Sequence, residues 1–189
     1  MQRSRPGATP VTITPIRALP TAPRLPGRHR RMGWIAPCAV GVIVATTYVV
    51  YAAWQWSQFT VKSWDLSIFA QLLDNYARMQ PPIVNIKGDG YNLLGDHFHP
   101  LLALIAPVYA IAPHAFTLLA VQAVCFAIAA AMFTRTATRS LGTVAGGVLL
   151  GLAFGFSWGL QYAAEAQFHE IALAVPLLTC SLSALLERR

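Results

Sequence analysis

The chain has 189 residues, of which 56% are hydrophobic and only 11% are charged, and its formal net charge is +7. Soluble domains carry about 25% charged residues, so this composition excludes an ordinary soluble globule and indicates a protein covered by lipid. The positive charge does not indicate nucleic-acid binding, because half of the Lys and Arg residues lie in residues 1–32, where no aromatic side chain accompanies them.

The first 32 residues are rich in proline and arginine and contain no acidic residue. Such a segment buries too little apolar surface to fold, so residues 1–32 are predicted to be disordered. A basic segment directly before an apolar run also acts as a topology signal. The N-terminus is therefore predicted to lie in the cytoplasm.

Four apolar runs are each predicted to cross the membrane. A helix needs about 20 apolar residues to cross ~30 Å of hydrocarbon. The runs cover residues 33–55, 115–134, 142–163 and 168–186. The fold class is therefore an all-α integral membrane protein with about four transmembrane helices, in which residues 33–189 form the membrane domain.

The loop between the first two spans, residues 56–114, is predicted to lie outside the membrane and to carry two interfacial helices. The first, residues 65–79, has an amphipathic pattern that suits a helix in the interface. Its apolar face is formed by Leu66, Phe69, Leu73, Tyr76 and Ala77. The second, residues 98–111, is apolar but short for a span and contains Pro107, which favours an interfacial or re-entrant helix. A hairpin is expected between them, around residues 88–90.

The distribution of basic residues favours four spans over five. If residues 98–111 do not cross, the outer segments hold only the basic residues Lys62, Arg78 and Lys87. If they did cross, Arg135 and Arg139 would move to the outer side, which the positive-inside rule disfavours. The predicted location is a cytoplasmic (inner) membrane.

Two polar clusters are expected to meet at the outer face. The first contains Asp65, Asp96, His97 and His99, and the second contains Glu165, Gln167, His169 and Glu170. Ionisable side chains near a bilayer are costly to desolvate, so they often have a function. Structural explanations also exist: Asp65 suits a helix N-cap, and the pair His169-Glu170 suits a polar helix start. His97 and His99 share one face only in an extended segment, and zinc normally has three or four protein ligands.

Three motifs and one residue carry a family resemblance over roughly residues 60–186. They are WDLSIFAQLL (64–73), GDHFHP (95–100), Gln122 and FHEIALAVPLL (168–178). Together they resemble a family of bacterial membrane proteins catalogued as domain of unknown function 2079. That family is similar in layout to the GT-C glycosyltransferases, which use polyprenyl-phosphate-linked sugars.

The resemblance implies roles for the polar residues. Asp65 would be the first catalytic acidic residue and act as general base, and Glu170, or His169 beside it, would occupy the second catalytic position. His97, His99, His169 and Asp96 would bind substrate. His169 and Glu170 are also the candidates for holding a divalent metal, if the reaction uses one.

The predicted function is therefore a GT-C-like transferase that uses a lipid-linked sugar at the outer face, with membrane lipids and polyprenyl-phosphate sugar as partners. GT-C enzymes have more spans than four, so an N-terminal portion of a larger enzyme is expected. The alternative is a non-enzymatic subunit, or a protein that binds lipid or a partner. A transporter is less supported, because mid-span positions are apolar apart from Gln122. An enzyme predicts that Asp65 and Glu170 converge, whereas a structural protein does not.

Overall fold

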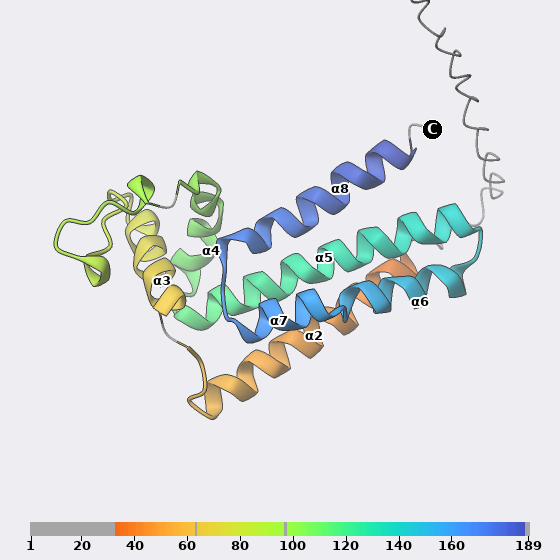
Figure 1. Ribbon diagram of the computed structural model, residues 1–189, viewed down its shortest axis with the longest axis horizontal. Coiled ribbons are helices and arrows are strands. Elements are labelled where there is room, and N and C mark those ends of the chain that lie inside the picture. Colours follow the sequence, from red (N-terminus) through yellow and green to blue (C-terminus); the bar gives the residue numbers. More distant parts are fainter. Residues whose placement is uncertain (1–32, 63, 97, 188–189) are drawn as a thin grey trace, which may run out of the picture.

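The computed structural model describes residues 33–62, 64–96 and 98–187, so the predicted tail (1–32) and His97 lie outside the described residues. The helices of the four long apolar segments are α2 (Ile35–Ser57), α5 (Ala115–Leu141), α6 (Val144–Gly155), α7 (Trp158–Glu165) and α8 (Ala174–Glu187), the last preceded by the 3₁₀ helix η4 (Glu170–Leu173). The loop holds α3 (Trp64–Ala77), η1 (Asn85–Lys87), η2 (Leu93–Gly95), η3 (Pro100–Ile105) and α4 (Ala106–Ile111) (Figure 1).

The all-α membrane architecture predicted from composition is confirmed. Four helical segments are long and apolar enough to cross a membrane: Ile35–Ser57, Ala115–Leu141, Val144–Glu165 and Glu170–Glu187. The segment Pro100–Ile111 is apolar but shorter. Across the described part of the chain there is no β-strand, only one isolated antiparallel bridge between Ile83 and Asn92. That bridge lies where the hairpin was expected, on either side of Gly88 and Gly90.

Helix α5 is the centre of the bundle, because α2, α6 and α8 all pack against it (Figure 1). The loop elements α3 and α4 gather at the end of the bundle where α5 and α8 begin (Figure 1). Glycines on one face of α6 allow its close approach. A Cβ atom added at Gly151 would lie 1.8 Å from Thr134 Oγ1 on α5, and one at Gly155 would lie 2.5 Å from Val44 Cγ2 on α2. Small residues spaced in this way let membrane helices pack backbone to backbone.

The second span is longer than predicted. The sequence predicted a span over residues 115–134, but α5 continues to Leu141. Gly142 ends it in the left-handed conformation, with φ of 70°. Arg135 and Arg139 therefore lie on the last turns of the helix. The Arg135 guanidinium stacks 4.1 Å from the centroid of the Trp34 ring, and Arg139 forms an ion pair with Glu187.

The third span is not the single helix expected over residues 142–163. It is divided into α6 and α7 at Phe156 and Ser157. The fourth span likewise begins with the 3₁₀ turn η4 before α8. Backbone groups at such breaks lose their helical partners, so side chains have to bind them.

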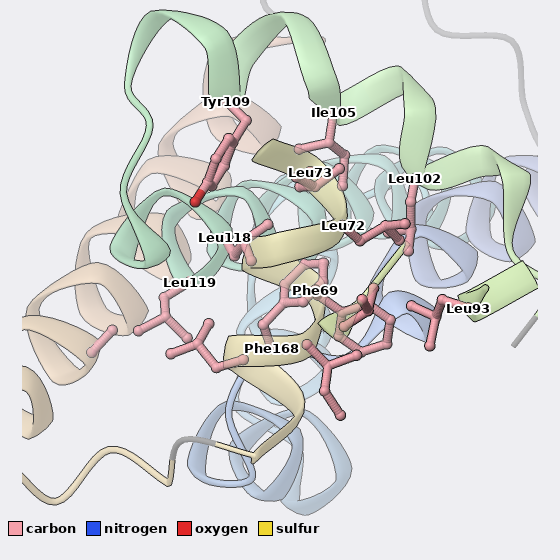
Figure 2. Packing of buried hydrophobic residues seen from close by; sticks show 14 residues of the cluster. Phe69, Leu72, Leu73, Leu93, Leu102, Ile105, Tyr109, Leu118, Leu119 and Phe168 are labelled. Carbon is pink, nitrogen blue, oxygen red and sulfur yellow. The ribbon is translucent and has the colours of Figure 1, made fainter. Parts of the chain in front are cut away.

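The predicted apolar face of α3 is used for packing inside the protein rather than for contact with lipid. Leu66, Phe69 and Leu73 are all at most 3% exposed. They pack against η3, α4, the start of α5 and Phe168 (Figure 2). The helix ends at Ala77, two residues earlier than the predicted 65–79, and Met79 follows it with φ of 56°.

The segment 98–111 divides its apolar side chains between two environments. Leu102, Ile105 and Tyr109 are buried against α3 (Figure 2). The opposite face is an exposed apolar stripe, which we call the η3–α4 stripe and which consists of Leu101, Leu104, Val108 and Ile111. A short helix that is apolar on both faces suits a place between the protein and the acyl chains of a bilayer.

Candidate functional site

Asp65 lies in the first turn of α3, at the end of the bundle that carries the loop. Because α3 begins at Trp64, Asp65 is inside the helix and not at its N-cap. A carboxylate in the first turn interacts favourably with the helix dipole. Its side chain is half exposed, at 50%, and its Oδ2 faces the connection between α7 and η4. The carboxylate is therefore held by the fold and still open to a ligand.

The connection from α7 to η4 directs two consecutive side chains into the interior and the next one into the site. Gln167 takes a positive φ of 78°, and Gln167 and Phe168 are both almost fully buried. The Phe168 ring packs edge to face on Phe69, with centroids 5.6 Å apart. Phe69 is one helical turn after Asp65, so this contact brings the start of α3 against His169. An extended backbone at His169 then points the imidazole toward α3.

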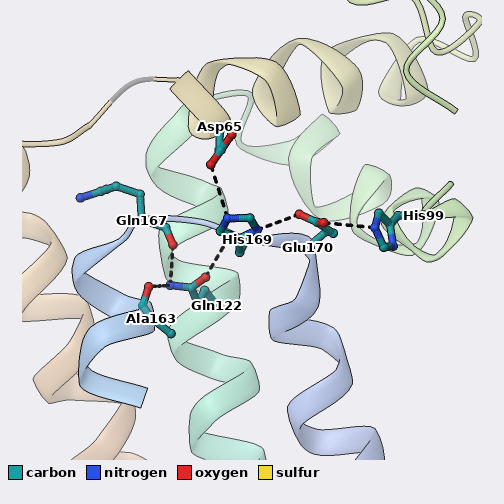
Figure 3. A network of polar contacts seen from close by, with 7 residues as sticks. All are labelled: Asp65, His99, Gln122, Ala163, Gln167, His169 and Glu170. Carbon is teal, nitrogen blue, oxygen red and sulfur yellow. Dashed lines mark hydrogen bonds and ion pairs between the residues drawn. The ribbon is translucent and has the colours of Figure 1, made fainter. Parts of the chain in front are cut away.

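His169 joins the two acidic residues that the sequence singled out (Figure 3). Its Nε2 lies 3.4 Å from Asp65 Oδ2, and its Nδ1 lies 3.1 Å from Glu170 Oε2. The other Glu170 oxygen, Oε1, lies 3.1 Å from His99 Nε2. The result is a chain of alternating carboxylates and imidazoles, which we call the Asp65–His99 chain: Asp65, His169, Glu170 and His99.

The two carboxylates of the Asp65–His99 chain differ in their environment. The Glu170 side chain is only 10% exposed, whereas those of Asp65, His169 and His99 are about half exposed. A buried carboxylate needs hydrogen-bond donors, and the two imidazoles supply them to Glu170. The imidazole of His169 can donate to both of its carboxylates only when both ring nitrogens carry hydrogen. Glu170 is thus the anchored member and Asp65 the accessible one.

Asp96, another predicted site residue, forms an ion pair with Lys87. This hydrogen bond raises the pKa of the Lys87 ammonium group above its ordinary value. Arg78 is also paired, with Asp74 one turn earlier on α3 at 3.0 Å. The predicted ligand His97 lies outside the described residues.

A divalent metal does not fit His169 and Glu170 in this arrangement. Both ring nitrogens of His169 face carboxylates, and both carboxylate oxygens of Glu170 face imidazoles. No group of three or more His, Cys, Asp or Glu side chains among the described residues is arranged to hold a metal ion.

Three buried glutamines lie directly beneath the site. Gln122 of α5 forms one hydrogen bond to α7 and two to the connection that follows it, and Gln167 Nε2 lies 3.5 Å from Gln55 Oε1 on α2. Gln122 was visible in the sequence as a polar residue in the middle of an apolar span. Gln55 was not identified, because nothing in the α2 sequence shows which helix its side chain meets. A polar residue near the end of an uncharged run was the available signal.

The family model described as "Predicted membrane protein (DUF2079)" matches residues 56–189. The matched region contains the loop and the last three spans, and with them every member of the Asp65–His99 chain and Gln122. No curated protein and no solved structure matches the chain significantly.

Proposed function

The chain belongs to the DUF2079 family of membrane proteins, and on that premise we propose that it is a GT-C-like glycosyltransferase, or part of one, that takes sugar from a lipid-linked donor. The observation that supports this proposal is the meeting of Asp65 and Glu170 at His169. These residues come from the first loop and from the connection between the last two spans, as a two-carboxylate site of this type requires.

In this proposal Asp65 is the general base. Its carboxylate takes the proton from an acceptor hydroxyl while the hydroxyl oxygen forms a bond to the anomeric carbon of the donor sugar. The bond from that carbon to the phosphate oxygen breaks, and the lipid phosphate leaves with the electron pair. His169, held by Glu170, orients the Asp65 carboxylate through the 3.4 Å contact.

The departing phosphate needs a cation nearby, and Lys62 is the basic residue that we assign to it. Lys62 is exposed and lies three residues before Asp65. Arg78 and Lys87 already form ion pairs with carboxylates of the loop. An ammonium group close to a leaving phosphate stabilises the charge that develops on it.

The site is proposed to face the outer side of the bacterial inner membrane. The opposite end of the bundle carries Arg135 and Arg139 at the end of α5. Basic residues at membrane-helix ends favour the cytoplasmic side. This orientation places the N-terminus in the cytoplasm and the Asp65–His99 chain outside.

A second candidate function is a non-enzymatic subunit, and the exposure of α8 is the observation that favours it. Only 6% of the fourth span is buried within the described part of the chain. Its outward side chains are Leu177, Leu178, Leu182, Leu185 and Leu186. A helix with so little packing of its own is available to further membrane helices as well as to lipid.

The test separates lipid binding from transfer. The longest natural form of the protein, purified in mild detergent, is analysed by native mass spectrometry with undecaprenyl phosphate and bulk phospholipid in competition. Transfer is then assayed with a panel of undecaprenyl-phosphate hexoses and hydroxyl acceptors, for the wild type, Asp65→Asn and Asp89→Asn. Asp89 is the matched control, because it is an exposed carboxylate between Gly88 and Gly90.

The proposal expects selective retention of undecaprenyl phosphate by all three proteins. Removing a general base lowers the rate by about 10²–10⁴, so Asp65→Asn should lose transfer while Asp89→Asn keeps it. Retention of bulk phospholipid alone, with no transfer by any of the three proteins, would overturn the proposal of a glycosyltransferase and favour a non-enzymatic subunit.

A further inference from the structure

The α7–η4 connection interrupts the helical backbone inside the bundle. Ala163 is among the last four residues of α7, whose carbonyl groups have no partner within the helix. His169 is the N-cap of η4, so its amide also lies outside the regular helix. Two ends of a helix break therefore present unpaired carbonyl and amide groups at the same place.

Gln122 meets both of these ends with one side chain (Figure 3). Its Nε2 donates to Ala163 O at 3.2 Å and to Gln167 O at 3.1 Å. Its Oε1 accepts from the backbone amide of His169 at 3.1 Å. A glutamine amide has two donor hydrogens and one acceptor oxygen, which is the set that this break requires.

The depth of Gln122 makes these bonds important. It lies seven residues after the first residue of α5, which corresponds to ~10 Å along the helix axis. The Gln122 side chain is only 3% exposed. Irregular backbone at membrane depth is tolerated where protein groups satisfy it, because water and lipid do not.

We infer that Gln122 is a positioning residue, which caps both ends of the α7–η4 break and thereby holds the His169 ring between Asp65 and Glu170. The His169 amide is fixed by Gln122, and the ring on the same residue contacts both carboxylates. This role belongs to the site on which the proposed function rests. It can nevertheless be tested through the His169 amide without any transfer assay.

The variants of Gln122 separate its donor and acceptor roles. Gln122→Met has nearly the same length but removes all three hydrogen bonds. Gln122→Glu keeps an acceptor for the His169 amide and loses the amide hydrogens that bind Ala163 O and Gln167 O. Gln161→Met is the matched control, because Gln161 is an exposed α7 glutamine whose side chain binds Phe156 O and not the site.

The measurement is amide hydrogen exchange by NMR with selective ¹⁵N-histidine labelling. The chain has five histidines, so the spectrum is sparse, and His169→Gln identifies the His169 signal. The amide of His114 donates to Ala112 O at 2.8 Å and does not involve Gln122, so it serves as the internal reference. The ratio of the His169 rate to the His114 rate reports local opening at the His169 amide. A general loss of stability raises both rates and therefore cancels in the ratio.

Gln122→Met should raise the His169-to-His114 exchange ratio by about tenfold, the effect of losing one net hydrogen bond. Gln122→Glu should leave the ratio within about threefold of the wild type, because the acceptor remains. The side-chain ¹³C signals of the His169 ring should shift in Gln122→Met and stay unchanged in Gln161→Met.

An unchanged exchange ratio and an unchanged ring signal in Gln122→Met would overturn the role of Gln122. If that variant does not fold, Gln122→Asn, whose amide is one methylene shorter, should show the raised ratio instead. An unchanged ratio in Gln122→Asn would then overturn it. The two proposals can fail separately. If the wild type shows no transfer but Gln122→Met raises the exchange ratio, the proposed reaction is wrong and the role of Gln122 in positioning His169 stands.

Discussion

Phe69 and Phe168 pack edge to face at an interplanar angle of 78°, and this contact couples the loop to the last span. Phe69 lies one turn after Asp65 on α3, and Phe168 directly precedes His169. Both rings are at most 3% exposed, inside the cluster that also holds Leu72, Leu102 and Leu118 (Figure 2). The apolar contact therefore sets the distance between the polar residues above it.

Phe168→Ala tests this coupling. Removing a fully buried aromatic side chain should destabilise the protein by about 3–5 kcal/mol, because apolar contacts are lost and a cavity is left in the cluster. The free energy of unfolding can be measured by titration with a denaturing detergent. Phe98→Ala is the control, since Phe98 is 75% exposed, and a surface change of this kind costs about 0.5 kcal/mol or less. Equal losses in the two variants would contradict the coupling.

Gly151→Ala tests the packing of α6 on α5. The added methyl group would lie 1.8 Å from Thr134 Oγ1 and 2.9 Å from Thr134 Cβ, so the helices have to separate. Overpacking of this kind should destabilise by about 1–3 kcal/mol. Gly159→Ala should not, because nothing lies within 4 Å of its added Cβ. Thermal unfolding in detergent measures both.

A double-mutant cycle then identifies the contact. Thr134→Ala removes the hydroxyl that a methyl at Gly151 would strike, so Gly151→Ala should cost less in the Thr134→Ala background than in the wild type. Residues in contact show interaction energies of about 0.5–3 kcal/mol in such cycles. Strict additivity would mean that the two side chains do not meet.

The η3–α4 stripe is expected to contact acyl chains. A nitroxide attached through Leu104→Cys, in a background without the native cysteines, should be more accessible to oxygen than to a polar nickel complex, because oxygen concentrates in hydrocarbon. Leu104 is 74% exposed, so a label there does not disturb the core. Asp89→Cys in the hairpin should show the opposite preference. A Leu104 label that favours the nickel complex would place the stripe in water.

The orientation of the bundle can be tested with a membrane-impermeant maleimide on intact cells. Asp89→Cys, in the hairpin of the loop between the first two spans, should react directly. Ser140→Cys, near the end of α5 beside Arg139, should react only after the membrane is permeabilised. The reverse pattern would put the Asp65–His99 chain in the cytoplasm and remove the donor topology on which the proposed function depends.

The sequence by itself determined the class of fold and the candidate residues. A shortage of charge together with apolar runs of about 20 residues requires a lipid-covered helical protein, since backbone groups in hydrocarbon must be paired within each helix. The four spans follow from that requirement. The short motifs indicated the family, and the resemblance singled out the carboxylates of Asp65 and Glu170. The sequence did not show where α5 ends. The predicted span stops before Arg135, but the helix continues past Arg139 until Gly142 terminates it in the left-handed backbone conformation.

Only the tertiary structure decided which polar groups meet. His169 lies between Asp65 and Glu170 because Phe168 packs on Phe69 and Gln122 binds the broken backbone, and both contacts join residues far apart in the chain. The same holds for α3, whose apolar face is identical in sequence whether it faces lipid or protein. Hydrophobic periodicity shows that a face is to be buried, but the partner that buries it depends on contacts between distant segments.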